Sequence, residues 1–135
     1  MWLPASSFKE KGLTMAKILT VDDAAFMRKI IKNTLGQAGY TEIYEAADGM
    51  QAIQVYQQIK PNLVLLDITM PNLNGLNTLR ALRTLDPNAN VVMCTAMGQE
   101  NMVIECMQHG AKDFIVKPFK AERLQKTVAS VIGAP

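Results

Sequence analysis

From residue 17 onward, short runs of apolar and β-branched residues alternate with longer stretches in which apolar residues recur every three or four positions. The short runs have the length and composition of β-strands, and the longer stretches have the 3.6-residue period of amphipathic helices. The runs LVLL, NVVMC and FIV contain adjacent apolar residues, which is typical of strands buried on both faces. We expect strands at Ile18–Val21, Glu42–Ala46, Leu63–Asp67, Asn90–Thr95 and Asp113–Lys117.

An apolar helical face follows each expected strand, and glycine or proline marks the joins. The five faces comprise Met27, Ile30, Ile31, Leu35 and Ala38; Ala52, Ile53, Tyr56 and Ile59; Leu76, Leu79 and Leu82; Val103, Ile104 and Met107; and Leu124, Val128, Val131 and Ile132.

Five strand–helix units in succession predict an α/β fold with a parallel sheet, right-handed crossovers and helices on both faces. At this length the commonest arrangement is the flavodoxin-like, doubly wound (βα)5 fold with strand order 2-1-3-4-5. We expect residues 15–135 to form this single domain, because Met15 opens the segment MAKILTVDD like a natural start. Residues 1–14 are too short and too polar for a secretory signal, and we expect a disordered extension there, either an artificial remnant or an upstream start.

Composition excludes several classes of partner. The formal net charge is +2 and the basic residues are dispersed, which argues against a nucleic-acid surface. No apolar run approaches the roughly 18–20 residues that span a bilayer. Cys94 and Cys106 lie in a strand pattern and a helical pattern, as expected of reduced cysteines in a cytoplasmic protein.

Polar residues gather at the carboxyl ends of four of the expected strands. The first strand ends in Asp22 and Asp23, the third in Asp67, the fourth in Thr95 and the fifth in Lys117. In the order 2-1-3-4-5 these four strands are contiguous, and open α/β sheets bind ligands outside the carboxyl ends of their strands. We therefore expect three carboxylates, a hydroxyl and an ammonium group to meet in one crevice.

Such a crevice favours a divalent cation and a phosphoryl group. Two carboxylates about 4 Å apart repel by roughly 4 kcal/mol at an effective dielectric constant of 20. Mg²⁺ prefers a few carboxylates, retained waters and a phosphate oxygen as ligands. Asp67 is ionised at neutral pH and needs no general base, so it is the candidate nucleophile, which would form an acyl phosphate beside Lys117.

Each residue alone has a simpler interpretation. An aspartate before a helix is often only an N-cap, a threonine at a strand end can cap the next helix, and a lysine is commonly on the surface. The combination of Asp22 and Asp23 with Asp67, Thr95 and Lys117 favours a site instead.

Four segments, VDDAAFMR, LLDITMPNLNG, MCTAMGQ and KDFIVKPF, resemble the signature segments of response-regulator receivers, most closely those of CheY-type chemotaxis regulators. The resemblance covers about residues 16–132. It implies that Asp67 is phosphorylated, that Lys117 contacts the phosphoryl group, and that the bond before Pro118 is cis. It also implies that Thr95 and Phe114 are the switch residues. By the same resemblance, Mg²⁺ is held by Asp22, Asp23, Asp67 and the backbone carbonyl of Thr69.

The implied function is that of a stand-alone, monomeric switch in a two-component phosphorelay. The resemblance implies a CheA-type histidine kinase as phosphoryl donor and a flagellar motor switch protein as target, with a phosphatase as a further partner. We expect no output domain after the fifth helix, so that the signal would pass by binding another protein. A phosphorelay intermediate, which hands the phosphoryl group to a histidine phosphotransferase, is the alternative within the family.

Two functions of other classes fit less well. An aspartate-nucleophile phosphatase needs a carboxylate two residues after the nucleophile, where this chain has Thr69, so we expect self-phosphorylation and slow self-hydrolysis and no turnover of outside substrates. A flavodoxin-like electron carrier needs a phosphate cradle after the first strand, where Asp22 and Asp23 would repel a flavin phosphate.

Overall fold

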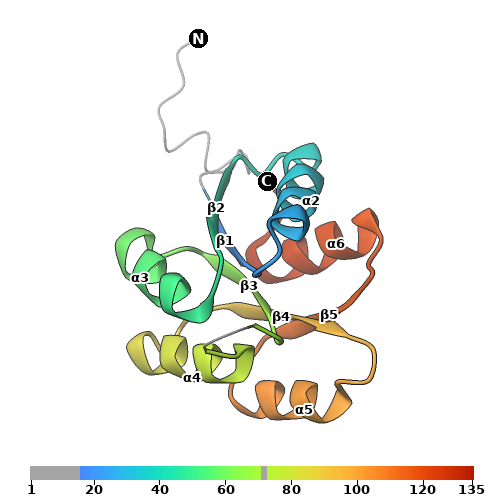
Figure 1. Ribbon diagram of the computed structural model, residues 1–135. Coiled ribbons are helices and arrows are strands. Elements are labelled where there is room, and N and C mark those ends of the chain that lie inside the picture. Colours follow the sequence, from blue (N-terminus) through green and yellow to red (C-terminus); the bar gives the residue numbers. More distant parts are fainter. Residues whose placement is uncertain (1–15, 71–72) are drawn as a thin grey trace.

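The computed structural model describes residues 16–70 and 73–135, and strands and helices alternate throughout this part of the chain (Figure 1). The expectation for residues 1–14 falls outside the described residues. The strands are β1 (Lys17–Val21), β2 (Glu42–Ala46), β3 (Leu63–Asp67), β4 (Val91–Ala96) and β5 (Asp113–Lys117), and the helices are α2 (Ala25–Gln37), α3 (Gly49–Ile59), α4 (Gly75–Leu85), α5 (Glu100–Gln108) and α6 (Ala121–Ile132).

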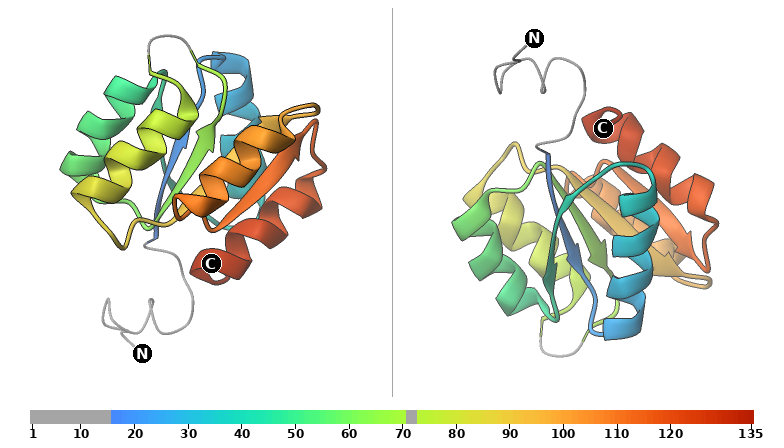
Figure 2. Two further views of the ribbon diagram at one scale, coloured as in Figure 1. Left: turned by 90° about the horizontal axis from the view of Figure 1, so that it is seen from below. Right: turned by 90° about the horizontal axis from the view of Figure 1, so that it is seen from above.

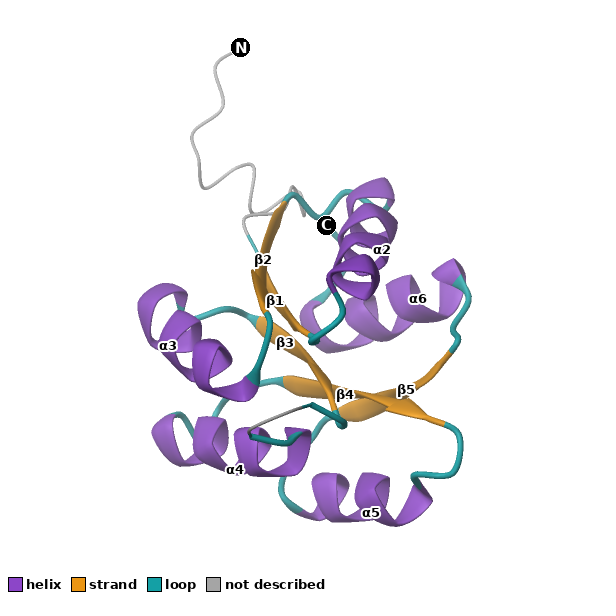
Figure 3. Ribbon diagram, in the orientation of Figure 1, coloured by secondary structure: helices purple, strands orange, loops and turns teal. Residues whose placement is uncertain are grey.

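The five strands form one parallel sheet in the order β2-β1-β3-β4-β5 (Figure 3), which confirms the predicted fold. The strand bounds differ from the prediction by one residue at a few ends. β4 includes Ala96 because this residue pairs with Lys117 of β5, and the pairing carries the strand one position beyond Thr95.

The sheet separates two apolar cores. On one face α3, α4 and α5 cover the sheet, and Ala52, Leu79 and Cys106 pack there against alternate strand residues (Figure 2). On the other face α2 and α6 contribute Leu35 and Val128. Since β3 is fully buried on both sides, its adjacent apolar residues are explained by the two cores.

The start of α4 lies close against the carboxyl end of β3. The Gly75 N–H donates to the Ile68 carbonyl oxygen at 2.8 Å, and a Cβ atom at position 75 would collide with the Asp67 carbonyl oxygen. Glycine is therefore required here for the close approach of two backbones. Its effect is to hold the end of the loop that follows Asp67 against the strand.

None of the helices in the described residues is long and apolar enough to cross a membrane.

Candidate functional site

Three aspartates meet at the carboxyl edge of the sheet. Asp22 follows β1 and is 2% exposed, Asp67 ends β3 and is 8% exposed, and Asp23 is exposed. One carboxylate oxygen from each residue lies within 4.8 Å of those of the other two. The adjacency of β1 and β3 in the sheet produces this cluster, because it aligns two strand ends that are 45 residues apart in the sequence.

The backbone around Asp22 is fixed by several hydrogen bonds. The Asp22 N–H donates to the Ala46 carbonyl oxygen at 3.1 Å, and the Ala24 N–H donates to Asp22 Oδ1 at 2.9 Å. Arg28 of α2 donates from Nη1 to the Asp22 carbonyl oxygen at 2.6 Å, and its Nε contacts Glu45 Oε1 of β2 at 2.9 Å. These contacts leave Asp22 Oδ2 for the interior of the site.

Lys117 brings a positive charge from the fifth strand. Its Nζ lies 2.7 Å from Asp22 Oδ2 and 3.5 Å from Asp67 Oδ1, so one ammonium group bridges the ends of β1 and β3. The Lys117–Pro118 peptide bond is cis. The lysine offsets only part of the negative charge, because the cluster holds three carboxylates.

The electrostatics follow from burial and from this imbalance. Burial raises the pKa of Asp67, and the nearby Asp22 charge raises it further, while Lys117 and the Thr69 N–H act in the opposite direction. Burial lowers the pKa of Lys117, but its hydrogen bond to Asp22 and the charges of both aspartates outweigh burial, so the net pKa is raised. The site therefore favours the charged form of Lys117 and disfavours the charged form of Asp67.

The donor set fits a hard divalent cation. All three side chains offer oxygen, they approach closely enough to share one ion, and Asp23 is exposed on the solvent side. Mg²⁺ favours such an arrangement and keeps several waters. Thr69 follows two residues after Asp67, with its N–H 3.4 Å from Asp67 Oδ1. The metal-ligand role of its backbone carbonyl stays a prediction.

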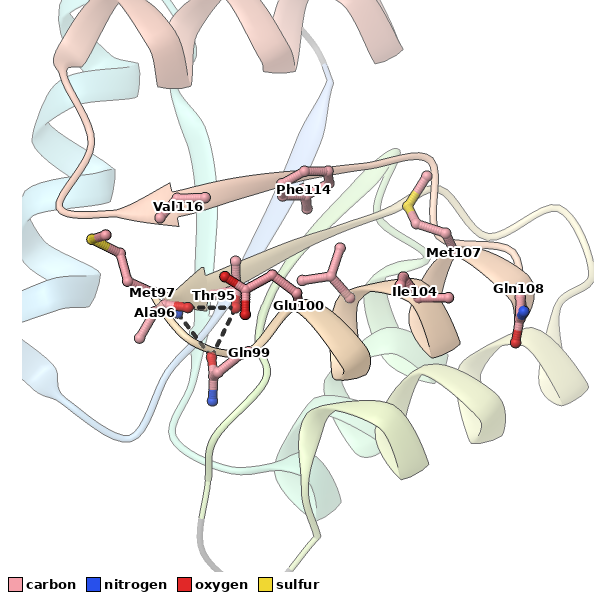
Figure 4. Close-up of a pocket in the computed structure, with 11 residues that line it drawn as sticks. Thr95, Ala96, Met97, Gln99, Glu100, Ile104, Met107, Gln108, Phe114 and Val116 are labelled. Carbon is pink, nitrogen blue, oxygen red and sulfur yellow. Dashed lines mark hydrogen bonds between the residues drawn. The ribbon is translucent and has the colours of Figure 1, made fainter.

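Thr95 lies at the same edge, but its hydroxyl is engaged elsewhere. The side chain is buried, and Oγ1 lies 2.8 Å from Gln99 Oε1 and 3.1 Å from the Ala96 carbonyl oxygen (Figure 4). Thr95 therefore lies on β4, the strand next to that of Asp67, as predicted from the sequence. Its hydroxyl is within hydrogen-bond distance of Gln99 in the loop that follows β4.

Phe114 of β5 lines a cavity with a volume of about 740 Å³ beside this loop (Figure 4). The cavity lies between β4, β5 and α5, and Thr95, Gln99 and Ile104 also line it. The Phe114 ring is half-buried and packs against the core that α3, α4 and α5 cover. Thr95 and Phe114, the two residues expected to form the switch, therefore line one apolar hollow.

Sequence reasoning missed two residues that structure the site. Arg28 appears in the segment VDDAAFMR, but the helical period gives no reason for its guanidinium to reach back to the Asp22 carbonyl. Gln99 contacts Thr95 and, through Nε2, the hydroxyl of Thr69 at 2.6 Å. Gln99 ends the segment MCTAMGQ, but nothing in that segment indicates its contacts, and a glutamine at the amino end of a helix is common without such a role.

Comparison with known proteins gives consistent matches. The family model described as response regulator receiver domain matches residues 18–129. The chemotaxis protein CheY of Thermotoga maritima is 46% identical over 115 residues, which cover 85% of this chain and 96% of that protein. Protein CcdB of Bacillus subtilis is 50% identical over 119 residues, which cover 88% of this chain and 99% of that protein.

The fold has similarly close counterparts. A CheX-CheY-BeF3-Mg²⁺ complex from Borrelia burgdorferi contains a chain with a TM-score of 0.83 and 35% identity, and the match covers 91% of this chain and 97% of that one.

Proposed function

We propose a function from the family to which the chain belongs, the response regulator receiver family, whose CheY-like chemotaxis regulators are among its relatives. In this proposal the protein is a switch that is activated when Asp67 accepts a phosphoryl group. One observation carries the proposal: three carboxylates that can share one cation lie beside a lysine whose Nζ is 3.5 Å from Asp67 Oδ1. A purely structural cluster would gain nothing from burying Asp67 as an anion.

The chain's own groups account for the transfer. An Asp67 carboxylate oxygen bonds to phosphorus while the bond from phosphorus to the histidine nitrogen of the donor breaks, and the electron pair stays with that nitrogen. Lys117 moves its contact from Asp67 toward the incoming phosphoryl oxygens and stabilises their charge. Asp67 needs no proton acceptor, because it attacks as a carboxylate.

We assign the metal site to Asp22, Asp23, Asp67 and the Thr69 carbonyl. Mg²⁺, when bound there, supplies the positive charge that lets an anionic phosphoryl group approach an anionic nucleophile. Asp22 and Asp67 are held by strand ends and by Lys117, whereas Asp23 can adjust in solvent.

The protein acts as a signalling protein and does not turn over outside substrates. Thr69 stands where an aspartate-nucleophile phosphatase has its acid/base carboxylate, so hydrolysis of the acyl phosphate depends on unassisted water and is slow.

For partners we propose a CheA-type histidine kinase as donor and a flagellar motor switch protein as target, with a phosphatase that ends the signal. The solved complex of a CheY with CheX, BeF3 and Mg²⁺ from Borrelia burgdorferi supports a further protein partner besides the kinase and the target. We further propose that the protein acts in the cytoplasm as a monomer.

The direct test uses acetyl phosphate as donor. With Mg²⁺, intact mass spectrometry should show the gain of one phosphoryl group, which disappears when EDTA replaces Mg²⁺ and in Asp67→Asn. An unchanged mass in the wild-type protein, or phosphorylation that persists in Asp67→Asn, would contradict the assignment.

A second experiment separates the chemotaxis role from the relay role. A motor regulator should bind a motor-switch peptide more tightly after phosphorylation, by tenfold or more, and should retain its phosphoryl group when mixed with a histidine phosphotransferase. Rapid transfer to the phosphotransferase without peptide binding would favour the relay.

A further inference from the structure

Gln99 joins two loops that flank the phosphoryl-acceptor site. It lies between β4 and α5, where its Oε1 accepts hydrogen bonds from Thr95 Oγ1 at 2.8 Å and from the Ala96 N–H at 2.8 Å (Figure 4). Its Nε2 donates to Thr69 Oγ1 at 2.6 Å, across 30 residues of sequence. One half-buried amide therefore ties the loop after β4 to the loop after β3.

The amide oxygen of Gln99 and the hydroxyl of Thr95 both have their hydrogen-bonding positions occupied within this network. An amide oxygen has two lone pairs, and both face donors here, from Thr95 and from Ala96. The Thr95 hydroxyl has one proton to donate, and two acceptors lie within hydrogen-bond distance of its Oγ1, Gln99 Oε1 and the Ala96 carbonyl oxygen. Thr95 cannot donate to a phosphoryl oxygen on Asp67 without giving up these contacts.

We propose that Gln99 is a positioning residue that acts as a latch: it holds the Thr95 hydroxyl and the Thr69 loop in the resting arrangement and opposes activation until a phosphoryl group competes for the Thr95 proton. The inference rests on the proposed function, because it concerns the same acceptor site. In this proposal Gln99 shifts the equilibrium between the resting and the active state toward the resting state. It does so because its hydrogen bonds form in the resting state only, and they therefore stabilise that state alone.

Removal of the latch should make activation easier. BeF3⁻ on Asp67 stands for the covalent phosphoryl group, so its affinity in saturating Mg²⁺ measures the cost of reaching the active state. In Gln99→Ala we expect this affinity to rise about three- to tenfold, the range expected when one or two ordinary hydrogen bonds are lost from the resting state only. The affinity for Mg²⁺ alone is measured in parallel, because Gln99 contacts Thr69 and any change in metal binding must be separated from the effect on BeF3⁻.

Isothermal titration calorimetry measures both affinities in a matched set of proteins. Gln99→Met keeps the length of the side chain without its hydrogen bonds and should behave as Gln99→Ala does, which guards against an effect of lost packing. Gln108→Ala removes an exposed amide from the end of α5, the helix that follows Gln99, and should bind BeF3⁻ as the wild type does.

A second readout follows Thr95 directly. In methyl NMR spectra without BeF3⁻, the Thr95 methyl resonance of Gln99→Ala should shift toward its position in the BeF3⁻-bound wild type.

The outcomes separate the two levels of the proposal. If the wild type binds BeF3⁻ in an Asp67-dependent way but the folded Gln99 variants bind it equally or more weakly, the latch is wrong and the acceptor site stands. If the wild type does not bind BeF3⁻ at all, the proposed function fails and the latch fails with it.

Discussion

Asp67 is the residue in which function and stability conflict most directly. Its proposed role as nucleophile requires a carboxylate at a strand end, and that position buries the carboxylate beside Asp22. Lys117 relieves part of the cost, at distances of 2.7 Å to Asp22 and 3.5 Å to Asp67. The result is a site whose charge is balanced only when a cation is bound.

The substitution Asp67→Asn should therefore stabilise the metal-free protein. Burial raises the pKa of Asp67 in the folded state, so the unfolded chain releases this proton at lower pH, and stability is lost as pH rises through the interval between the two pKa values. At neutral pH in EDTA we expect the melting temperature of Asp67→Asn to exceed that of the wild type by about 2–5 °C. The difference should shrink at acidic pH, where Asp67 is protonated.

Asp48→Asn is the matched control. The Asp48 side chain caps α3 by accepting from the Gln51 N–H, and asparagine caps helices as well as aspartate does, so the melting temperature should stay nearly constant. Equal melting temperatures for wild type and Asp67→Asn in EDTA would mean that the buried charge costs nothing.

At the residue scale, the sequence was sufficient to predict the groups that the strands position. Asp22, Asp67 and Lys117 each follow an apolar run, and strand order alone brings them together. Arg28 and Gln99 could not be predicted in this way, because their contacts depend on side-chain reach across loops.

At the scale of the elements, the close approach of α4 to β3 determines where the chain comes back to the sheet after Asp67. Gly75 permits this approach because a side chain there would meet the Asp67 and Ile68 backbone. Asn74 begins the helix, with its Oδ1 accepting from the Asn77 N–H at 2.9 Å. The helical period predicted α4, but the need for glycine at its first position became visible only when the strand end lay beside it.

Gly75→Ala should destabilise the protein by about 2 kcal/mol or more, because either the helix or the Asp67 backbone must move. Urea denaturation measures the free energy of unfolding. Gly36→Ala tests the same chemical change where a Cβ meets nothing within 4 Å, on an exposed part of α2, and should stabilise by roughly 0.5–1 kcal/mol. If Gly75→Ala changed the free energy of unfolding by no more than Gly36→Ala does, the backbones of α4 and β3 would not be in tight contact at Gly75.

At the scale of the whole molecule, one sheet serves two cores. Helices α3, α4 and α5 cover one face, and α2 and α6 cover the other, while β3 contributes side chains to both. The alternation of strands and helices in the sequence was sufficient to predict this layering, because parallel strands need crossover helices. Which helix covers which face followed from the strand order.

Because the cores share the sheet, they should unfold together. Leu82→Ala on one face and Leu35→Ala on the other each remove a fully buried side chain and should cost about 2–5 kcal/mol. In both variants, circular dichroism and native-state hydrogen exchange should report a single transition of the entire domain. Separate transitions for the two faces would contradict a shared sheet as the unit of stability.

The ion pair between Asp22 and Lys117 joins side chains that lie 95 residues apart in the sequence. One comes from the first strand to be synthesised and the other from the last, so a nascent chain still lacking β5 has the acidic residues without their ammonium partner. If Asp67 accepts a phosphoryl group beside Lys117, as proposed, the chain becomes competent for the transfer only once β5 has been synthesised.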